Sequence, residues 1–260
     1  MRPMLNVAIR IVRQIGDIVL QYYEIQKKYL NHTENYNFII IKMLRLINKI
    51  TIKSLNDIYS KNIIVSNKKE LLILKYKKTT WIINPLDGIV NFIKKLPHFA
   101  ISIAICIHGK TEVSLVYDPL RNDLFTAIRG QNTQLNGYKI RCTKFSHKKD
   151  NNFLLGLNPD YIFYSKNNIN FINILHQYLV SLRVSGSIAL DLAYVSSNKI
   201  NCYINNNITD FYYFIAGELL IKESGGLLTD FIGHYNYKYS KNILVAHSHI
   251  LQLLLSQKSN

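Results

Sequence analysis

The chain has few cysteines, and they are widely separated. Cys106, Cys142 and Cys202 are the only three in 260 residues. An odd number of distant cysteines supports neither a disulfide framework nor a cysteine-rich zinc site. We therefore expect reduced thiols in the core or at the surface.

The chain also lacks a long apolar run. Its longest apolar stretch, Phe99 to Ile107, is interrupted by Ser102 and is too short to cross a bilayer. The first residues contain no continuous apolar segment followed by a small-residue cleavage site, so no signal peptide is predicted. These features predict a cytoplasmic protein with no membrane partner.

Acidic residues are scarce. The 16 Asp and Glu residues face 32 Lys and Arg residues, for a formal net charge of +16. Such an excess suggests an acidic partner, and nucleic acid is the obvious one. The chain is also crowded with Lys, Asn, Ile and Tyr, as expected when AT-rich codons drift into tolerant positions. Charge alone leaves both interpretations open.

The remaining composition is that of a globular protein, with 48% hydrophobic residues and a mean hydropathy of +0.01. Apolar residues recur every three or four positions from Leu5 to Tyr22, which predicts a helix with one buried stripe. Further helices are predicted at about Ile39 to Leu55, Ile169 to Leu179, Ile188 to Val195 and Phe211 to Glu223. For the last of these, Thr209-Asp210 suits the N-cap and Gly225-Gly226 the C-terminal end.

Strands are predicted between these helices. Thr80 to Ile83 is a β-prone run that we expect to end in a turn at Asn84 to Gly88. Short turns connect three further strands into an expected antiparallel meander: Ile101 to Ile107, Glu112 to Tyr117 and Leu124 to Arg129. One more strand is expected near Ile200 to Ile204. Alternating blocks of sheet and helix predict a layered α/β or α+β fold.

The segment Trp81 to Phe92 resembles a motif of the inositol monophosphatase family, Asp-Pro-Leu-Asp-Gly-Thr-Thr-Asn-Phe. The frame of that family is also matched at Leu96 to Ala104, Thr111 to Val113, Val116 to Pro119, Leu135 to Tyr138, Gly186 to Tyr194, Ala216 to Leu220 and Glu223 to Gly226. The resemblance implies one inositol monophosphatase-like αβαβα domain over residues 1–260, with largely antiparallel sheets. Its N-terminal sheet and helix half would be about 1–140 and its C-terminal half 141–260.

The resemblance also implies a magnesium site, because the family hydrolyses phosphate esters with Mg²⁺ held by hard oxygen ligands. Of the matching positions, Asp87 and the backbone carbonyl of Leu86 are kept. The other metal and catalytic positions are occupied by Asn84, Ile89, Tyr213, and Ser66 and Asn67 in place of paired glutamates. Ile89 stands where the family has a threonine that helps to activate water. Two further acids of the family become Asn37 and Met43.

Such a site should bind magnesium weakly or not at all, with no intact catalytic residue. Glu70 and Asp210 are near the lost positions, but a solvated loop charge and a helix N-cap explain them better. The matching substrate positions are Gly88, Ile89, Arg183 and Glu218, as vestiges. Alternatively, Arg183 lies at a subunit contact and Glu218 on a solvent face.

Within the family, the chain is similar to bacterial members that serve as a Nus factor in the antitermination complex transcribing ribosomal RNA. This implies a homodimeric binding scaffold whose partners are RNA polymerase, other Nus factors and the ribosomal RNA leader. Two alternatives stay open. One is a magnesium-dependent inositol-1-monophosphatase with altered ligands, and the other is a decaying gene product that folds but has no partners.

Overall fold

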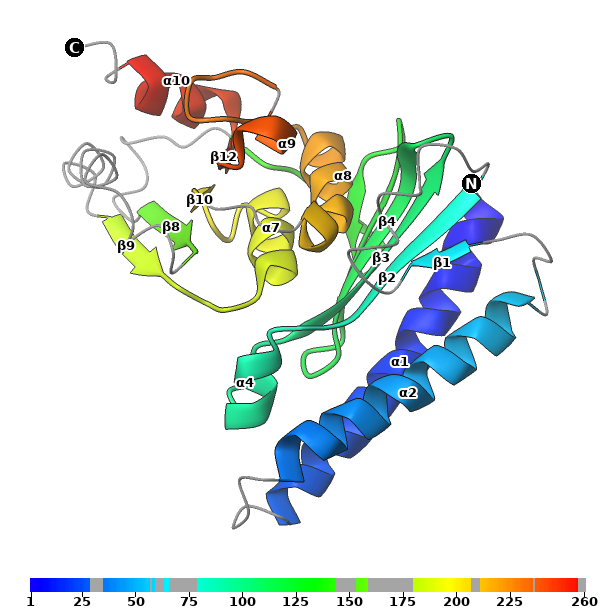
Figure 1. The fold of residues 1–260 in the computed structure, drawn as a ribbon. Helices are drawn as coiled ribbons and strands as arrows, with labels where there is room; N and C mark the ends of the chain where they lie inside the picture. The colour runs from blue at the N-terminus through cyan, green and yellow to red at the C-terminus, as the bar shows by residue number, and fades with distance from the viewer. Residues whose placement is uncertain are drawn as a thin grey trace.

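The computed structural model describes residues 1–28, 35–56, 58, 63–65, 79–143, 153–158, 180–206, 211–235 and 237–256. The chain forms alternating layers of helix and sheet (Figure 1). This arrangement confirms the predicted layered αβαβα fold.

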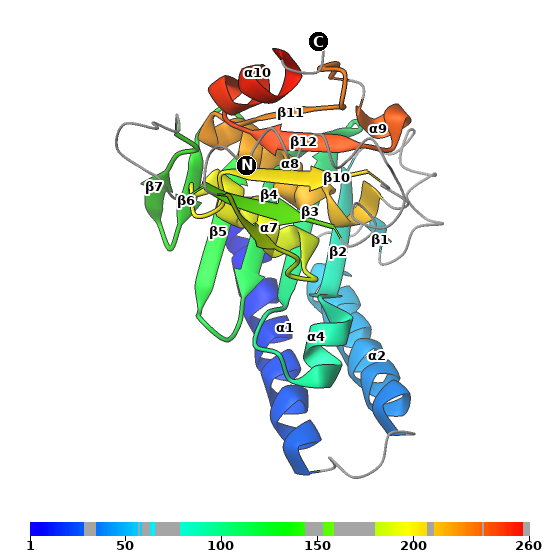
Figure 2. The ribbon, with the colours of Figure 1, turned by 90° about the vertical axis from the view of Figure 1, so that its left-hand side faces the viewer.

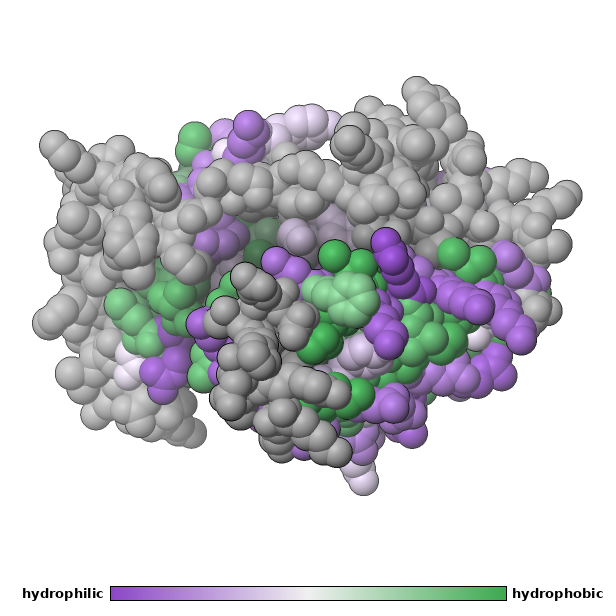
Figure 3. All heavy atoms as spheres, turned by 60° about the horizontal axis from the view of Figure 1, so that its bottom comes forward, coloured by the Kyte–Doolittle hydropathy of each residue, from purple (hydrophilic) through white to green (hydrophobic). Residues whose placement is uncertain are grey.

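Two long helices form the first layer. Helices α1 (Arg2–Lys28) and α2 (Asn35–Asn56) lie side by side in both ribbon views (Figures 1 and 2). The α1 stripe predicted from the sequence is buried, with Ala8, Val12, Ile15 and Val19 at most 1% exposed. The outer surface of this layer mixes hydrophilic and hydrophobic side chains (Figure 3).

The second layer is a seven-stranded sheet in the order β1-β2-β3-β4-β5-β6-β7. Its strands are β1 (Ile63–Val65), β2 (Thr79–Asp87), β3 (Ala100–Ile107), β4 (Lys110–Asp118), β5 (Asp123–Ile128), β6 (Thr133–Leu135) and β7 (Tyr138–Ile140). Only the β1–β2 pair is parallel among these described pairs. The predicted meander, β3-β4-β5, is confirmed.

Strand β3 shows how one sequence faces two helical layers. Ile101, Ile103 and Ile105 pack with α1 and α2, whereas Ala100 and Ala104 face the opposite side. Successive strand side chains point to opposite faces, so large residues meet one helix layer and small ones the other. The small face lets helices approach closely.

The third layer consists of α7 (Ile188–Ser196) and α8 (Ile215–Ser224). These helices pack tightly, because a Cβ added at Gly217 would lie 2.4 Å from Cδ1 of Leu192. The other face of this layer packs on a five-stranded sheet, in the order β11-β12-β10-β8-β9. Its strands are β8 (Phe153–Leu157), β9 (Val180–Arg183), β10 (Cys202–Asn205), β11 (Leu227–Thr229) and β12 (Ile243–Ala246).

Two short helices follow in the C-terminal part, α9 (Tyr237–Ser240) and α10 (Ser248–Ser256). Helix α10 covers the outer face of the five-stranded sheet through Ile250, Leu251 and Leu254. The three cysteines are unpaired and buried. None of the helices in the described ranges combines the length and apolar character needed to cross a bilayer.

Two predicted boundaries were wrong. Strand β2 continues to Asp87 instead of ending at Asn84, because it keeps pairing with β3 across an irregular step between Asn84 and Asp87. The helix expected from Phe211 is divided into a 3₁₀ turn, η2 (Phe211–Tyr213), and α8. Gly225 ends α8 as predicted, with φ of 90°. The helix predicted at 169–179 and the N-cap at 209–210 lie outside the described residues.

Candidate functional site

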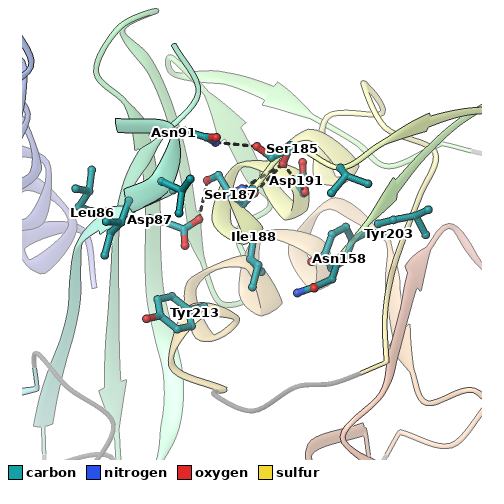
Figure 4. A pocket seen from close by; sticks show the side chains of 16 residues that line it. Leu86, Asp87, Asn91, Asn158, Ser185, Ser187, Ile188, Asp191, Tyr203 and Tyr213 are labelled. Carbon is teal, nitrogen blue, oxygen red and sulfur yellow. Dashed lines mark hydrogen bonds between the residues drawn. The ribbon is translucent and has the colours of Figure 1, made fainter. Parts of the chain in front are cut away.

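A cavity of about 520 Å³ lies where the end of β2 meets the start of α7 (Figure 4). Its walls come from 86–91 on β2 and the short helix α4 (Ile89–Lys94), 184–188 before α7, 157–158 after β8, and Asp191, Tyr203 and Tyr213. Two carboxylates, Asp87 and Asp191, are among these residues. Both are buried, with 4% and 2% exposure.

Asp87 is held by the first turn of α7. Its Oδ2 atom accepts a hydrogen bond from the Ser187 hydroxyl at 2.6 Å and one from the Ala189 N–H at 2.8 Å. Ser187, at the N-cap position, makes no side-chain cap of its own. A carboxylate at a helix N-terminus satisfies exposed N–H groups and complements the helix dipole. Asp87 therefore caps α7 from another element.

Asp191 lies one turn further along α7. Its Oδ2 atom accepts a hydrogen bond from the Ser185 hydroxyl at 2.7 Å, while Oδ1 is buried without a partner in the described structure. Burial raises the pKa of Asp191 to about 8, and the charge of Asp87 raises it further against the lowering effect of Ser185. Asp191 is therefore mostly protonated at neutral pH.

Asp87 titrates lower than Asp191. Burial raises its pKa to about 6, while hydrogen bonds from Ser187, Ala189 and Asn84 act in the lowering direction. At neutral pH the two carboxyl groups together carry about one negative charge. The cavity therefore offers much less negative charge than two ionised carboxylates would.

Five of the predicted site residues line this cavity: Leu86, Asp87, Gly88, Ile89 and Tyr213. Ile89 is 41% exposed and brings no polar atom. Asn84 is buried beside them on β2, where its Oδ1 atom accepts a hydrogen bond from the Leu86 N–H at 3.3 Å. The structure thus brings most of the predicted positions together.

Two predicted substrate positions lie elsewhere. Arg183 lines a neighbouring cavity, and its guanidinium donates to the carbonyl of Leu182. Glu218 is on α8, where it accepts hydrogen bonds from Lys222 at 2.6 Å and from the Tyr237 hydroxyl at 2.7 Å. The expectation that Glu218 faces solvent was wrong, because these contacts leave it only 8% exposed.

The upstream positions are only partly described. Asn37 and Met43 are both on α2, where Asn37 is exposed and Met43 is fully buried in the core. Ser66, Asn67, Glu70 and Asp210 lie outside the described residues. The described structure therefore says nothing about how those four contribute.

The described ligand set does not fit magnesium. No three His, Cys, Asp or Glu side chains gather into a possible metal site within the ranges given above. Asp87 already uses one oxygen in two hydrogen bonds, and the other described family positions offer an amide and a backbone carbonyl. Magnesium gives up its water shell reluctantly and is usually bound through carboxylates in octahedral geometry. These donors supply too little charge.

Several cavity residues were not singled out from the sequence. Asn91 joins two walls, because its Nδ2 atom donates to the carbonyls of His98 and Ser185, each at 2.7 Å. Gly186 has φ of 80°, and an added Cβ would lie 3.1 Å from Nδ2 of Asn91. Ser185, Ser187 and Asp191 were also missed as site residues. The matched frame of Gly186 to Tyr194 was the available signal for the last two.

The layered αβαβα fold, with Asn84-Pro85-Leu86-Asp87-Gly88 beside a cavity, defines the class of protein. A sequence model of the inositol monophosphatase family matches residues 1–260. The chain belongs to this family.

More specific similarities are to proteins named Nus factor SuhB. The chain is 39% identical to that of Buchnera aphidicola subsp. Baizongia pistaciae and 35% identical to that of Escherichia coli K12, each time over 98% of this chain and 96% of the relative. Among solved structures, the extragenic suppressor protein suhB from Bartonella henselae has a TM-score of 0.77 at 23% identity, covering 99% of this chain and 100% of that one. Inositol monophosphatase from Anabaena has a TM-score of 0.78 at 21% identity, covering 99% and 96%.

Proposed function

We propose that this protein is a SuhB-like Nus factor of the ribosomal RNA transcription antitermination complex. In this role it is a binding scaffold whose phosphatase activity is lost or very weak. Similarity over nearly the full length to proteins named Nus factor SuhB supports the role. A scaffold role requires a stable fold and contact surfaces, and it does not require a metal site.

The observation that carries the proposed loss of activity is the chemistry of the cavity. Asn84, Ile89 and Tyr213 replace residues with which the family holds metal or activates water, while Asp87 caps α7. Retention of Asp87 therefore has an explanation in folding. We propose Asp87 and the Leu86 carbonyl as remnants of the metal site, and Gly88, Ile89, Arg183 and Glu218 as remnants of the substrate site.

The proposed partners are RNA polymerase, other Nus factors and the ribosomal RNA leader, and the proposed active form is a cytoplasmic homodimer. The net charge of +16 favours association with an RNA, whose phosphates attract basic surfaces. Charge of this kind promotes encounter without specifying a sequence.

Two measurements on the purified protein test this proposal together. In the first, hydrolysis of inositol 1-phosphate is followed in excess Mg²⁺, with the Anabaena enzyme as a positive control. In the second, the immobilised protein captures purified RNA polymerase and Nus factors, with an unrelated basic protein as the control. We expect no hydrolysis above background and specific capture.

Other outcomes would contradict the proposal. Magnesium-dependent turnover without capture would establish the alternative, an inositol-1-monophosphatase with altered ligands. Neither turnover nor capture would identify a folded chain that has lost its partners. Each alternative therefore has its own experimental signature.

A further inference from the structure

A second cavity lies far from Asp87, between the first turns of α1 and the β5–β6 hairpin. Its volume is about 690 Å³. We call it the amide cleft, after the side chains that line it: Arg2, Leu5, Asn6, Thr126, Ala127, Ile128, Gln131, Asn132 and Gln134. It contains four carboxamides, one guanidinium and no carboxylate.

The polar groups of the amide cleft are not used by the fold. The side chains of Arg2, Asn6, Gln131, Asn132 and Gln134 make no hydrogen bond or ion pair with another described residue. Each carboxamide offers two N–H donors and a carbonyl acceptor. The cleft therefore presents paired donors and acceptors to a ligand.

The hairpin that carries these amides is well anchored. The Thr133 hydroxyl donates to the carbonyl of Leu220 at 2.6 Å, and the Asn132 N–H donates to the Glu223 carboxylate at 3.3 Å. Cross-strand pairing sets Gln134 opposite Thr126 on one side and Lys139 on the other. Anchoring of this kind lowers the entropy cost of binding.

A row of arginines leads away from the cleft along α1. Arg2, Asn6, Arg10 and Arg13 are all exposed, and their spacing of four, four and three residues places them on one face of the helix. Arg2, Arg10 and Arg13 make no ion pair with a described residue. The face therefore offers three unpaired guanidinium groups.

Helix stability does not explain these arginines. The first turn of α1 contains no acidic residue, and cations near a helix N-terminus oppose the dipole. Nor does drift towards Lys, Asn, Ile and Tyr favour arginine. The first 13 residues nevertheless hold three of the eight arginines, which are Arg2, Arg10, Arg13, Arg45, Arg121, Arg129, Arg141 and Arg183.

We infer that the amide cleft binds an unpaired base of single-stranded RNA, with Arg2 and Arg10 on the adjoining phosphates. Asn and Gln carboxamides match the donor and acceptor pairs of base edges, and arginine binds phosphate through paired N–H groups. Proteins read single-stranded RNA through such splayed bases. The inference rests on the proposed role in ribosomal RNA transcription and names the surface that meets RNA.

Binding of a short, unstructured RNA oligonucleotide, followed by fluorescence anisotropy, tests the inference. Arg2→Gln/Arg10→Gln should weaken binding roughly tenfold and lower the slope of log affinity against log salt by about two. Asn6→Ala/Gln134→Ala should weaken binding roughly tenfold and leave the salt slope unchanged. The matched control is Arg45→Gln/Lys49→Gln, which removes two exposed charges from α2 and should change affinity less than about twofold.

An equal loss in the α2 control would overturn the inference, because it would show binding by net charge alone. Unchanged binding in either cleft variant would also overturn it. Circular dichroism of each variant should match the parent, since these exposed side chains have no described partners. RNA polymerase capture with the same variants separates the two proposals: capture without cleft-dependent RNA binding rejects only the cleft, and the reverse rejects only the proposed function.

Discussion

Asp87 and Ser187 are 100 residues apart in the sequence, yet the Ser187 hydroxyl donates a hydrogen bond to Oδ2 of Asp87 at 2.6 Å. The same oxygen accepts from the N–H of Ala189. The end of β2 thereby caps α7, and the sheet is joined to the central helix layer. A residue that the family motif associates with metal has a separate structural role in this chain.

Removing the Asp87 cap should destabilise the fold. We expect Asp87→Ala to lower the free energy of unfolding by roughly 1–3 kcal/mol, because the buried Ser187 hydroxyl and Ala189 N–H lose their acceptor. Asp87→Asn should cost less, since an amide oxygen still accepts. Urea denaturation measures both, with the exposed Asp17→Asn as the control. If Asp87→Ala were as stable as the parent, the capping role would be wrong.

The buried carboxyl groups should make stability fall as pH rises. Asp191 and Asp87 have pKa values of about 8 and about 6, against an ordinary value of 3.8. Between these limits the folded state binds more protons than the unfolded state, so the free energy of unfolding decreases with increasing pH. This contribution is fully present below about pH 4 and is lost as the pH rises through 6 and 8.

Asp191→Asn isolates that effect, because the amide cannot ionise and its oxygen can still accept from Ser185. We expect the decrease in unfolding free energy between pH 5 and pH 8 to shrink by on the order of a few kcal/mol in the variant. Urea denaturation at both pH values provides the comparison. Parallel pH profiles for variant and parent would show that Asp191 ionises normally.

Gly88 should be needed for its backbone angle and for its close contact. Its φ is 89°, and an added Cβ would lie 2.9 Å from the carbonyl oxygen of His98. Gly109 has φ of 76° with nothing within 4 Å, so Gly109→Ala carries only the backbone cost of roughly 1 kcal/mol. We expect Gly88→Ala to cost about 1–3 kcal/mol more, measured by urea denaturation. Equal losses would mean that the contact relaxes freely.

The sequence predicted local features better than long-range ones. The buried stripe of α1, the β3-β4-β5 meander and the Gly225 helix end all follow from periodicity or turn chemistry within a few residues. The extension of β2 to Asp87 did not follow. Turn-forming residues predicted an end at Asn84, but pairing with β3 overrides that local preference.

The candidate site shows the same limit. The family frame placed Leu86, Asp87, Gly88, Ile89 and Tyr213 around one cavity, as the structure has them. It gave no sign of the Asp87–Ser187 hydrogen bond or of the raised Asp191 pKa, because both depend on burial between segments far apart in sequence. Glu218 was misplaced for the same reason, since Tyr237 covers it.

The central claim is that this cavity does not hold magnesium at physiological concentrations, and calorimetric titration with Mg²⁺ tests it most directly. The parent should give no saturable heat. A variant that restores the family ligands, Asn67→Glu/Asn84→Asp/Ile89→Thr/Tyr213→Asp, should bind at least about tenfold more tightly, because added carboxylates supply the missing charge. Saturable binding of two magnesium ions by the parent, at an affinity equal to that of the restored variant, would contradict the account.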